Sequence, residues 1–499
     1  MSGEYNKIVF VGQILDNVHG FIPYTAAENQ IMETQLFKRL QNIKQLSVVN
    51  WVFPGSEHTR FIHSLGVMHI ADKMAQSLGL DDNQRRLLRL AGLLHDIGHY
   101  PLSHVCEAAY READPLEEYP ENEFPQWLNT RVRDKIDDFS LKPTVSFMLQ
   151  SKYLHHEAVG AKIVRSNNEI CEIIKKECND DNAPDKIADI ITGNVDRHSK
   201  DYSGVDPLLV QILHSELDAD GIDYLMRDAM FSGTSFGNFE LEQLIRCLVR
   251  GEALGKPILC ITPKGIAAAD QYLINKFFSY SQVVFNKHIV IAEWMVKQIV
   301  MWALRHNAFF PSRSRIEEWA AKGGIDGYLG FTDNLLWSSL DLILKNELNE
   351  LVPHHIKAFC ENLLRHNELE FIKDSEVRFI SSSEEEAKEF LKESRFYMNP
   401  LDSEKHITLL NQRRLTKQVP RNVFERAFGE KEPDVDREEN QEEARKENWE
   451  VAHASRLMEG IAVKDGEDIH LLCDDWRSLI HRMYDANLVL LRSYKLPEG

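Results

Sequence analysis

The stretch of the chain richest in reactive side chains is LRLAGLLHDIGHYPLSHV, residues 88–105. His95, His99 and His104 fall in an otherwise apolar segment, and Asp96 follows the first of them directly. Burying an imidazole and a carboxylate together is costly unless something compensates both groups. A divalent cation would do so, because neutral imidazole and carboxylate oxygen are common metal ligands. A hydrogen-bonded His–Asp pair without metal is the alternative, and the dipeptide alone leaves both open.

Two more residues extend this pattern to four possible ligands. His63 stands in RFIHSLGVMHIAD, and Asp220 stands in LDADGIDYLMRD, 125 residues after His95. Two imidazoles and two carboxylates can hold one or two cations and leave positions open for water and a phosphate, as metal-assisted phosphoester hydrolysis requires. The order His, His-Asp, Asp resembles the pattern of the HD phosphohydrolase superfamily, and this resemblance implies a metal site formed by His63, His95, Asp96 and Asp220.

The elements that must position these residues are mainly helical. A short hairpin around NVHG precedes a helical pattern that starts at residue 26. The loop at 53–60 leads into an amphipathic helix ending near Gly79. Asp81 or Asp82 can cap the next helix, which runs through QRRLLRLAGLLHD to a break at Gly98, and Pro101 fits the first turn of the helix that follows.

The rest of the chain mixes helices with strands. Residues 205–230 have the pattern of one long helix, and residues 270–304 have that of one long buried helix or two. The segments KPILCIT, HITLLNQ and DIHLLCD are expected strands. Residues 113–150 look like a polar insertion, and the charge-dense run at 430–450 is expected to be a solvated helix or loop. The sequence thus predicts a mainly α protein with a mixed α+β C-terminal region.

Composition excludes several classes of protein. The 499 residues are 43% hydrophobic and 27% charged, as in an ordinary folded protein, and no apolar run is long enough to span a membrane. The net charge of −20 disfavours general nucleic-acid binding. Seven scattered cysteines fit reduced thiols, and the first residues do not resemble a secretory signal. We expect a cytoplasmic protein.

The motifs also resemble a known family. KRLQNIKQL, VFPGSEHTRFIHSLGV, LLHDIGHYPLSHVCE, HHEAVG and LDADGIDYLMRD occur in the order and approximate spacing of the dNTP triphosphohydrolases, in the SAMHD-like and bacterial dNTPase branch of the HD phosphohydrolase superfamily. The resemblance covers roughly residues 8–300 and fades in the C-terminal third. It implies a catalytic HD core at 1–245, a long-helix extension at 246–310 and a mixed α+β region of unknown role at 311–499.

This resemblance implies a reaction. A water activated by Mn, Fe, Mg or Zn, as one or two ions, attacks the α-phosphorus of a dNTP and releases a deoxynucleoside and inorganic triphosphate. His104 would protonate the departing 5′ oxygen, since a histidine titrates near neutral pH. Glu107, three residues later on the same helical face, would orient it. His99 and His156 would contact the α-phosphate.

The resemblance also implies a pocket for the substrate. Arg60 would grip the phosphates with its guanidinium fork. Gln45 and Asp228 would bond the sugar 3′-hydroxyl, while Leu46 lies beside the sugar. The ring of Tyr224 would pack under C2′ and exclude a ribose hydroxyl. The alternative for Arg60 is an ordinary surface arginine. The alternative for Tyr224 and Leu46 is ordinary packing in the core.

The chain departs from the family in places. Gly221 replaces a phosphate-binding lysine just after Asp220, so that contact is missing or comes from elsewhere, for example from Lys287 or Arg227. Glu33 and Gln41 replace the aspartate and arginine that read guanine at the regulatory site of the animal enzyme, so activation by GTP is not expected.

Other properties implied by the family stay open. Asn286 replaces an aromatic residue or histidine near the nucleobase, which leaves the base preference undetermined. We expect a homo-oligomer, with a tetramer as the specific guess, and a nucleotide activator at a subunit interface. Two other functions compete with dNTP hydrolysis: a nucleotidase or phosphodiesterase built on the same metal site, and a catalytically silent dNTP sensor.

Overall fold

The structure is a computed structural model that describes most of the chain. The described residues are 7–113, 155–194, 204–324, 326–345, 352–372, 376–381, 386, 389–390, 405–423 and 452–497. The predictions for the insertion at 113–150, apart from Ala113, and for the charged run at 430–450 lie outside them.

The chain begins with the predicted hairpin. Strands β1 (Phe10–Asp16) and β2 (Gly20–Thr25) pair antiparallel. Thr25 then caps the first helix, and its capping box with Glu28 satisfies two backbone N–H groups that the helix cannot bond itself.

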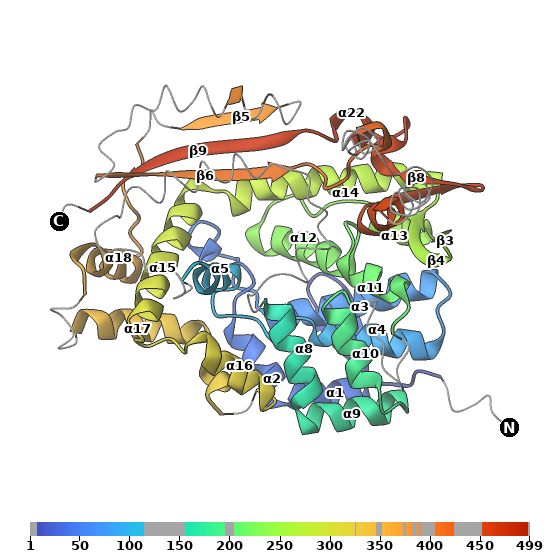
Figure 1. Ribbon diagram of the computed structural model, residues 1–499, viewed down its shortest axis with the longest axis horizontal. Helices are drawn as coiled ribbons and strands as arrows, with labels where there is room; N and C mark the ends of the chain where they lie inside the picture. The colour runs from blue at the N-terminus through green and yellow to red at the C-terminus, as the bar shows by residue number, and fades with distance from the viewer. Residues whose placement is uncertain are drawn as a thin grey trace, which may run out of the picture.

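A bundle of helices follows, and it occupies the lower and central part of Figure 1. Its helices are α1 (Ala26–Glu33), α2 (Gln35–Lys38), α3 (Arg60–Ser77), α4 (Asp82–Leu94), α5 (His104–Glu112), α8 (His156–Ser166), α9 (Asn168–Cys178), α10 (Ala183–Ile191), α11 (Pro207–His214), α12 (Ala219–Ser232) and α13 (Leu241–Arg246).

The helix before the His–Asp pair ends earlier than the sequence predicts. Asp81 caps α4 as predicted, but α4 ends at Leu94, so His95 and Asp96 lie in the turn that follows. The prediction for Pro101 is wrong, because α5 starts only at His104. Leu102 and Ser103 have φ of 49° and 57°, and this left-handed backbone keeps the residues after Pro101 out of the helix.

The expectation of one helix over 205–230 is also wrong. Helices α11 and α12 are separated by residues 215–218. The Glu216 carboxylate there accepts hydrogen bonds from Thr416 Oγ1 at 2.7 and 2.8 Å, from the backbone N–H of Lys417 at 2.8 Å and from Gln418 Nε2 at 2.6 Å. A distant segment therefore fixes the break, and Asp218 caps the new helix by accepting from Gly221 N.

The long apolar stretch at 270–304 forms two helices. Helix α14 (Ile266–Ser279) passes through a π-helical turn at Tyr280–Val284 before α15 (Lys287–Arg305) begins. The later helices are α16 (Arg313–Ala321), α17 (Asp333–Lys345), α18 (His354–Leu364) and α22 (Ile480–Met483).

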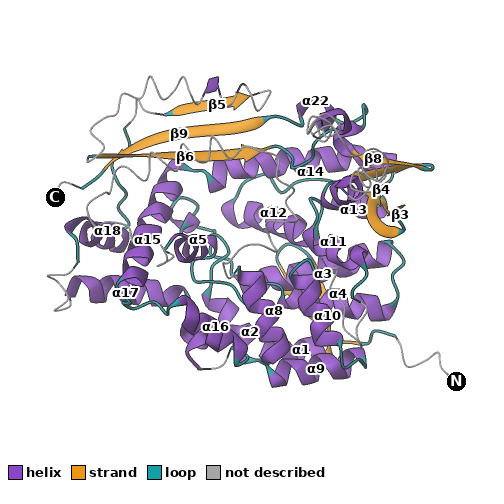
Figure 2. Ribbon diagram, in the orientation of Figure 1, coloured by secondary structure: helices purple, strands orange, loops and turns teal. Residues whose placement is uncertain are grey.

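Two small sheets complete the C-terminal region, and the predicted strands lie in them (Figure 2). One has the order β3-β4-β7-β8, with β4 and β7 parallel, and the other is antiparallel with the order β5-β9-β6. Their strands are β3 (Leu248–Ala253), β4 (Lys256–Ile261), β5 (Val377–Ser381), β6 (His406–Arg414), β7 (Ala462–Asp465), β8 (Asp468–Leu471) and β9 (Asn487–Lys495). The predicted class, mainly α with a hairpin and a mixed C-terminal region, is confirmed.

The C-terminal elements share their packing with the helical bundle. One cluster of buried apolar side chains extends from Ile22 to Tyr494. Helix α15 packs on α5, and α16 packs on α8. The division at residues 245 and 310 therefore stays a prediction. Among the described helices, none is long and apolar enough to cross a membrane.

Candidate metal centre and substrate pocket

Three of the four predicted metal ligands, His63, His95 and Asp96, bring ligand atoms within 4.8 Å of one another, and Asp220 lies beside the two histidines. Asp220 Oδ1 lies 2.9 Å from His63 Nε2 and 3.9 Å from His95 Nε2. Asp96 carboxylate oxygens lie 3.9 Å from His63 Nε2 and 3.5 Å from His95 Nε2. Three separate segments, the first turn of α3, the turn after α4 and the first turn of α12, supply these groups.

A carboxylate behind His63 fixes the direction of its ring. Asp223 Oδ2 lies 2.7 Å from His63 Nδ1, which turns Nε2 toward Asp220. Arg227 donates to Asp223 and to Asp16 of the N-terminal hairpin, so the hairpin holds this carboxylate in place. A Cβ on Gly66 would lie 1.8 Å from Asp223 Oδ1, so the close approach of α12 to α3 requires glycine there.

The donor set fits a divalent cation. His95 directs Nδ1 at the Gly92 carbonyl oxygen, 2.8 Å away, and Nδ1–H donation there would leave a lone pair on Nε2. The Nε2 atoms of His95 and His99 are buried and have no hydrogen-bond partner among the described residues, while Nε2 of His63 faces the Asp220 carboxylate. Unpaired buried nitrogens beside two carboxylates are what imidazole and carboxylate ligands present to a metal.

The electrostatics of the centre agree with this fit. Burial alone would lower the pKa of His63, but the carboxylates of Asp220 and Asp223 raise it to about 10. Burial opposes ionisation of Asp96, yet Arg60 and the surrounding histidines hold its pKa well below the usual range. A cation would therefore replace a proton on His63 and meet an ionised Asp96.

A second cluster of histidines adjoins the centre. His99, His104, Glu107 and His156 bring one ligand-type atom each within 4.8 Å of the others. His156 Nε2 lies 3.9 Å from Asp96 Oδ1, which joins the two clusters. A Cβ on Gly98 would lie 2.2 Å from backbone atoms of His156 and Gly160, so glycine lets α8 approach the His–Asp turn.

Glu107 orients three histidines at once. Its carboxylate lies 3.4 Å from His104 Nδ1, 2.8 Å from His155 Nδ1 and 3.0 Å from His156 Nδ1. Burial opposes its ionisation, but these histidines lower the pKa of Glu107. His155 is absent from the predicted site, although its position beside His156 in HHEAVG was the available signal.

The histidines of this cluster differ in charge and exposure. Burial lowers the pKa of His156, but Glu157 and Glu107 outweigh it and raise that pKa to about 9. Burial, Arg60 and His156 hold the pKa of His99 well below 6.5, so its ring is neutral. The His104 side chain is 70% exposed, so this ring is accessible from outside.

Arg60 lies between the metal centre and the turn before α5. Its Nη1 donates to Asp96 Oδ2 at 2.8 Å, and its Nε donates to Ser103 Oγ at 3.1 Å. The guanidinium is therefore buried beside the predicted metal ligands.

The residues predicted to bind the sugar are linked through His58. The backbone N–H of Gln45 donates to the His58 carbonyl, and His58 Nε2 lies 2.8 Å from Asp228 Oδ1. Gln45 Oε1 is buried without a hydrogen-bond partner among the described residues. Leu46 lines a neighbouring cavity, and Tyr224 is half-buried on α12, one turn after Asp220.

Tyr272, Asp218 and Lys276 surround the position of Gly221. A Cβ there would lie 2.4 Å from Tyr272 Oη, 2.6 Å from Asp218 Oδ1 and 3.2 Å from Lys276 Nζ. Lys276 Nζ donates to Tyr272 Oη at 3.2 Å and lies 5.2 Å from the centre of the Tyr224 ring. Neither substitute proposed from the sequence is free: Arg227 is fully buried and paired with Asp16 and Asp223, and Lys287 Nζ lies over the Phe371 ring. No motif marks Lys276, because α14 brings it from 55 residues further along the chain.

Comparison with curated proteins identifies the central motif. Residues 60–220 match the family model described as HD domain. An uncharacterized protein of Methanocaldococcus jannaschii is 30% identical over 288 residues, 58% of this chain and 49% of that protein. The SAMHD1 homolog of Dictyostelium discoideum, named as a deoxynucleoside triphosphate triphosphohydrolase, is 27% identical over 229 residues, 44% of this chain and 37% of its own length. The first of these matches thus spans about half of the relative, and the second spans less.

Solved structures share the fold over nearly the whole chain. A hypothetical protein of Aquifex aeolicus has a TM-score of 0.62 at 21% identity, covering 97% of this chain and 96% of its own. A phosphohydrolase of Bacteroides thetaiotaomicron has a TM-score of 0.59 at 18% identity, covering 97% and 99%. The converging His, His-Asp and Asp residues lie within or at the end of the segment 60–220 that matches the HD domain, and the proteins similar to this chain include ones named as deoxynucleoside triphosphate triphosphohydrolases.

Proposed function

We propose that this protein is a metal-dependent hydrolase that converts dNTPs to deoxynucleosides and inorganic triphosphate. The observation that carries the proposal is the convergence of the buried Nε2 atoms of His63 and His95 with the carboxylates of Asp96 and Asp220, one helical turn from Tyr224. The metal would bind the phosphate, while the half-buried Tyr224 ring and the His58–Asp228 pair beside it would contact the sugar. This arrangement suits a phosphate ester of a deoxynucleoside.

His63, His95, Asp96 and Asp220 would hold the cation. When bound, it lowers the pKa of a water and neutralises phosphate charge. The other residues then have separate tasks. Neutral His99 can accept a hydrogen bond from the attacking water, and protonated His156 can donate to an α-phosphate oxygen.

His104 is the proposed proton donor to the 5′ oxygen. Its Nδ1 faces Glu107, so its Nε2 is free to face the substrate. Glu107, 3.4 Å from that Nδ1, can hold the ring in this orientation.

Positive charge for the polyphosphate comes from two directions. Lys276 lies over the Tyr224 ring, and Arg60 lies beside Asp96. Arg413 of β6 lies over the Tyr280 ring, 3.9 Å from its centre, and adds a third cation next to α14. In a chain with a net charge of −20, such local concentration is how a polyanion can be attracted.

The products of hydrolysis test this function. The purified protein is incubated with each dNTP, singly and in pairs, with Mn²⁺ or Mg²⁺, and the products are separated by ion exchange. We expect inorganic triphosphate, and loss of at least about 10³-fold in turnover in the double variant His95→Ala, Asp96→Ala. The double variant His470→Ala, Asp468→Ala removes another His–Asp pair, 2.7 Å apart on β8, and should keep turnover.

Other products would identify the competing functions. Phosphate or pyrophosphate in place of triphosphate would favour a nucleotidase or phosphodiesterase. Tight dNTP binding with no turnover under any nucleotide mixture would favour a sensor. The homo-oligomer, its tetrameric form and a nucleotide activator stay predictions.

A further inference from the structure

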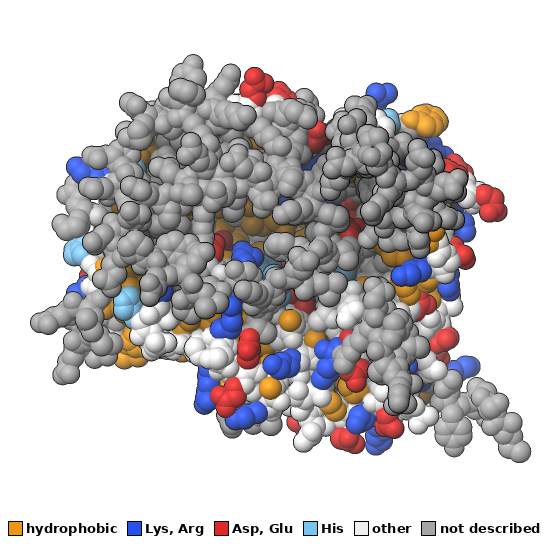
Figure 3. Space-filling view, viewed as in Figure 1, with side chains coloured by type: hydrophobic (Ala, Val, Ile, Leu, Met, Phe, Trp, Pro, Cys, Tyr) orange, Lys and Arg blue, Asp and Glu red, His pale blue; other side chains and the backbone are white. Residues whose placement is uncertain are grey.

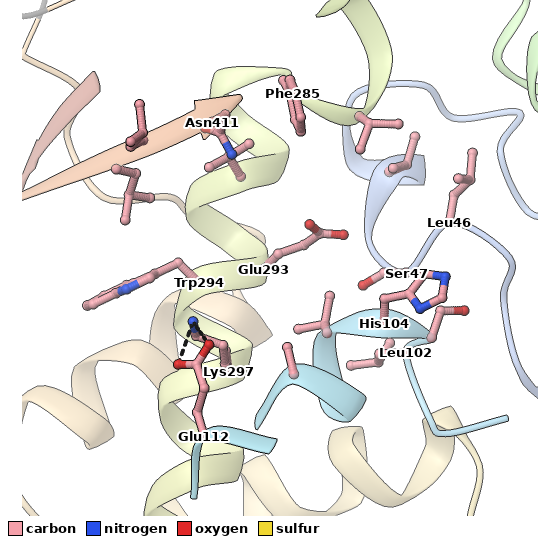
Figure 4. Close-up of a pocket in the computed structure, with 18 of the residues that line it drawn as sticks. Leu46, Ser47, Leu102, His104, Glu112, Phe285, Glu293, Trp294, Lys297 and Asn411 are labelled. Atoms are coloured by element: carbon pink, nitrogen blue, oxygen red, sulfur yellow. Dashed lines mark hydrogen bonds and ion pairs between the residues drawn. The ribbon is translucent and has the colours of Figure 1, made fainter. Parts of the chain in front are cut away.

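A cavity of about 440 Å³ adjoins the proposed sugar site. Gln45, Leu46, Ser103 and His104 line it on the side of the metal centre. Helix α15 and strand β6 form the opposite side, so the C-terminal region contributes a wall (Figure 4). A nucleotide whose phosphate lies at the metal and whose sugar lies beside Gln45 and Leu46 would extend its base toward this cavity.

The walls of the cavity are mainly apolar. Leu102, Val105, Val284 and Leu409 line it, and the rings of Phe285 and Trp294 border it on the α15 side. Flat apolar surfaces of this kind suit a heteroaromatic ring, because stacking on aromatic side chains is favourable for every base.

One polar group in this cavity lacks a compensating charge. The Glu293 carboxyl extends into the cavity toward Ser47 (Figure 4). Lys297, one turn later on α15, is committed to Glu112 at 3.0 Å, and no ion pair to Glu293 occurs in the described part of the chain. Burial raises the pKa of Glu293 to about 8, against a smaller opposing effect of Ser47. An unpaired carboxyl in an apolar cavity costs stability and marks a functional group.

A second polar side chain borders the same space, because Asn411 of β6 also lines the cavity (Figure 4). The two oxygens of an ionised Glu293 favour a base with two donors on one edge. Guanine presents its ring N–H and its exocyclic amino group side by side, which match the two oxygens of a carboxylate.

We propose that this cavity binds the nucleobase of the substrate and that Glu293, which gives up its proton to solvent when guanine binds, selects guanine by accepting from its ring N–H and its amino group. This inference rests on the proposed dNTP hydrolysis and names the base that the same site prefers. Thymine offers one donor on the corresponding edge, and hypoxanthine lacks the exocyclic amino group of guanine.

Comparison of dGTP with dITP tests this directly in the unaltered protein. The two substrates share sugar and phosphates and differ by the amino group alone. We expect kcat/KM for dGTP to exceed that for dITP by about tenfold or more, the value of a hydrogen bond to a charged group. Equal values would overturn the inference.

The isosteric variant Glu293→Gln assigns the effect to this side chain. Its amide keeps one acceptor but turns a donor toward the base, so the dGTP to dTTP ratio of kcat/KM should fall by about tenfold. Glu361→Gln, on the exposed face of α18, is the matched control and should keep the ratio. An unchanged ratio in Glu293→Gln would overturn the role of Glu293.

The two proposals fail in different ways. No hydrolysis of any dNTP would overturn the proposed function, and with it this inference. Hydrolysis of all four dNTPs to triphosphate, with dGTP and dITP equal, would overturn the guanine pocket and leave the hydrolase intact.

Discussion

At the scale of single residues, the orientation of His63 decides whether a metal can bind. Asp223 is fully buried, and it contacts His63, His19 and Arg227 at the same time. Such a carboxylate behind a ligating histidine fixes its tautomer and raises its basicity. The HD motif gives the ligands, but Asp223 supplies the direction in which one of them points.

We expect Asp223→Asn to weaken metal binding by about 10–100-fold, because an amide holds the His63 ring less firmly than a carboxylate. Mn²⁺ titration by calorimetry measures the change. The exposed carboxylate variant Asp341→Asn on α17 is the control and should bind Mn²⁺ like the unaltered protein. Undiminished affinity in Asp223→Asn would refute this role, and a urea unfolding curve shows whether the fold is retained.

We infer that Lys276 takes the place of the phosphate-binding lysine for which this chain has Gly221. We expect Lys276→Met to raise KM for dNTPs by about tenfold or more, since it removes a cation from the polyphosphate site. Lys276→Arg should restore most of the affinity, because charge is the property needed. Steady-state kinetics check both variants, and a KM unchanged in Lys276→Met would exclude the phosphate contact.

At the scale of elements, the start of α17 supports the turn that leads into α5. Asp333 Oδ1 accepts from the backbone N–H of Leu102 at 2.7 Å, and its Oδ2 accepts from that of Lys44 at 2.9 Å. Leu102 and Ser103 have left-handed backbone, which persists only where neighbours hold it. A C-terminal helix therefore positions His104.

We expect Asp333→Ala to lower the free energy of unfolding by about 2–3 kcal/mol, because two buried backbone donors lose their acceptor. Urea denaturation measures the loss. Substrate turnover should fall as well, since the strained turn before His104 loses its support. A variant with full stability and full turnover would contradict the role of α17.

The sequence predicts some of these elements and misses others for a physical reason. The His–Asp pair, the Asp81 cap and the hairpin depend on local sequence patterns, so they can be predicted from the sequence. The break at Glu216, the support from Asp333 and the position of Lys276 depend on contacts with segments tens to hundreds of residues away. A single sequence carries no signal for such pairings, and an apolar run at 205–230 looks continuous without them.

At the scale of the whole molecule, ionisable groups lie both on the surface and inside. On the face drawn in Figure 3, acidic and basic side chains are intermixed where the described surface is visible. Inside, ionisable groups gather at the candidate metal centre, and Glu293 lies in its own cavity. The stability of the whole protein should therefore depend on pH through these interior groups.

Glu293 is the interior group for which this pH dependence of stability can be predicted most clearly. Its pKa is about 8 in the folded protein, against 4.5 for an unperturbed glutamate, because burial opposes ionisation. As pH rises from about 4.5 to about 8, the unfolded chain releases this proton while the folded chain keeps it, so folding stability falls over that window. Glu293→Gln removes the titration. The free energies of unfolding of the variant and the unaltered protein should be most similar near pH 5. By pH 9 the variant should be more stable by on the order of 2 kcal/mol, a value reduced for the partial exposure of Glu293.

Urea midpoints of the two proteins between pH 5 and pH 9 measure this gain. Other titrating groups, including His104, Glu112 and Lys297 of the same cavity, are common to both proteins and cancel in the difference unless they respond to residue 293 itself. A difference that stays constant with pH would mean that Glu293 is ionised in the folded state at neutral pH and has a cationic or solvent partner. Saturating dGTP with Mg²⁺ should shrink the difference at pH 9, because the base donors would compensate the ionised carboxylate that the empty cavity leaves unpaired.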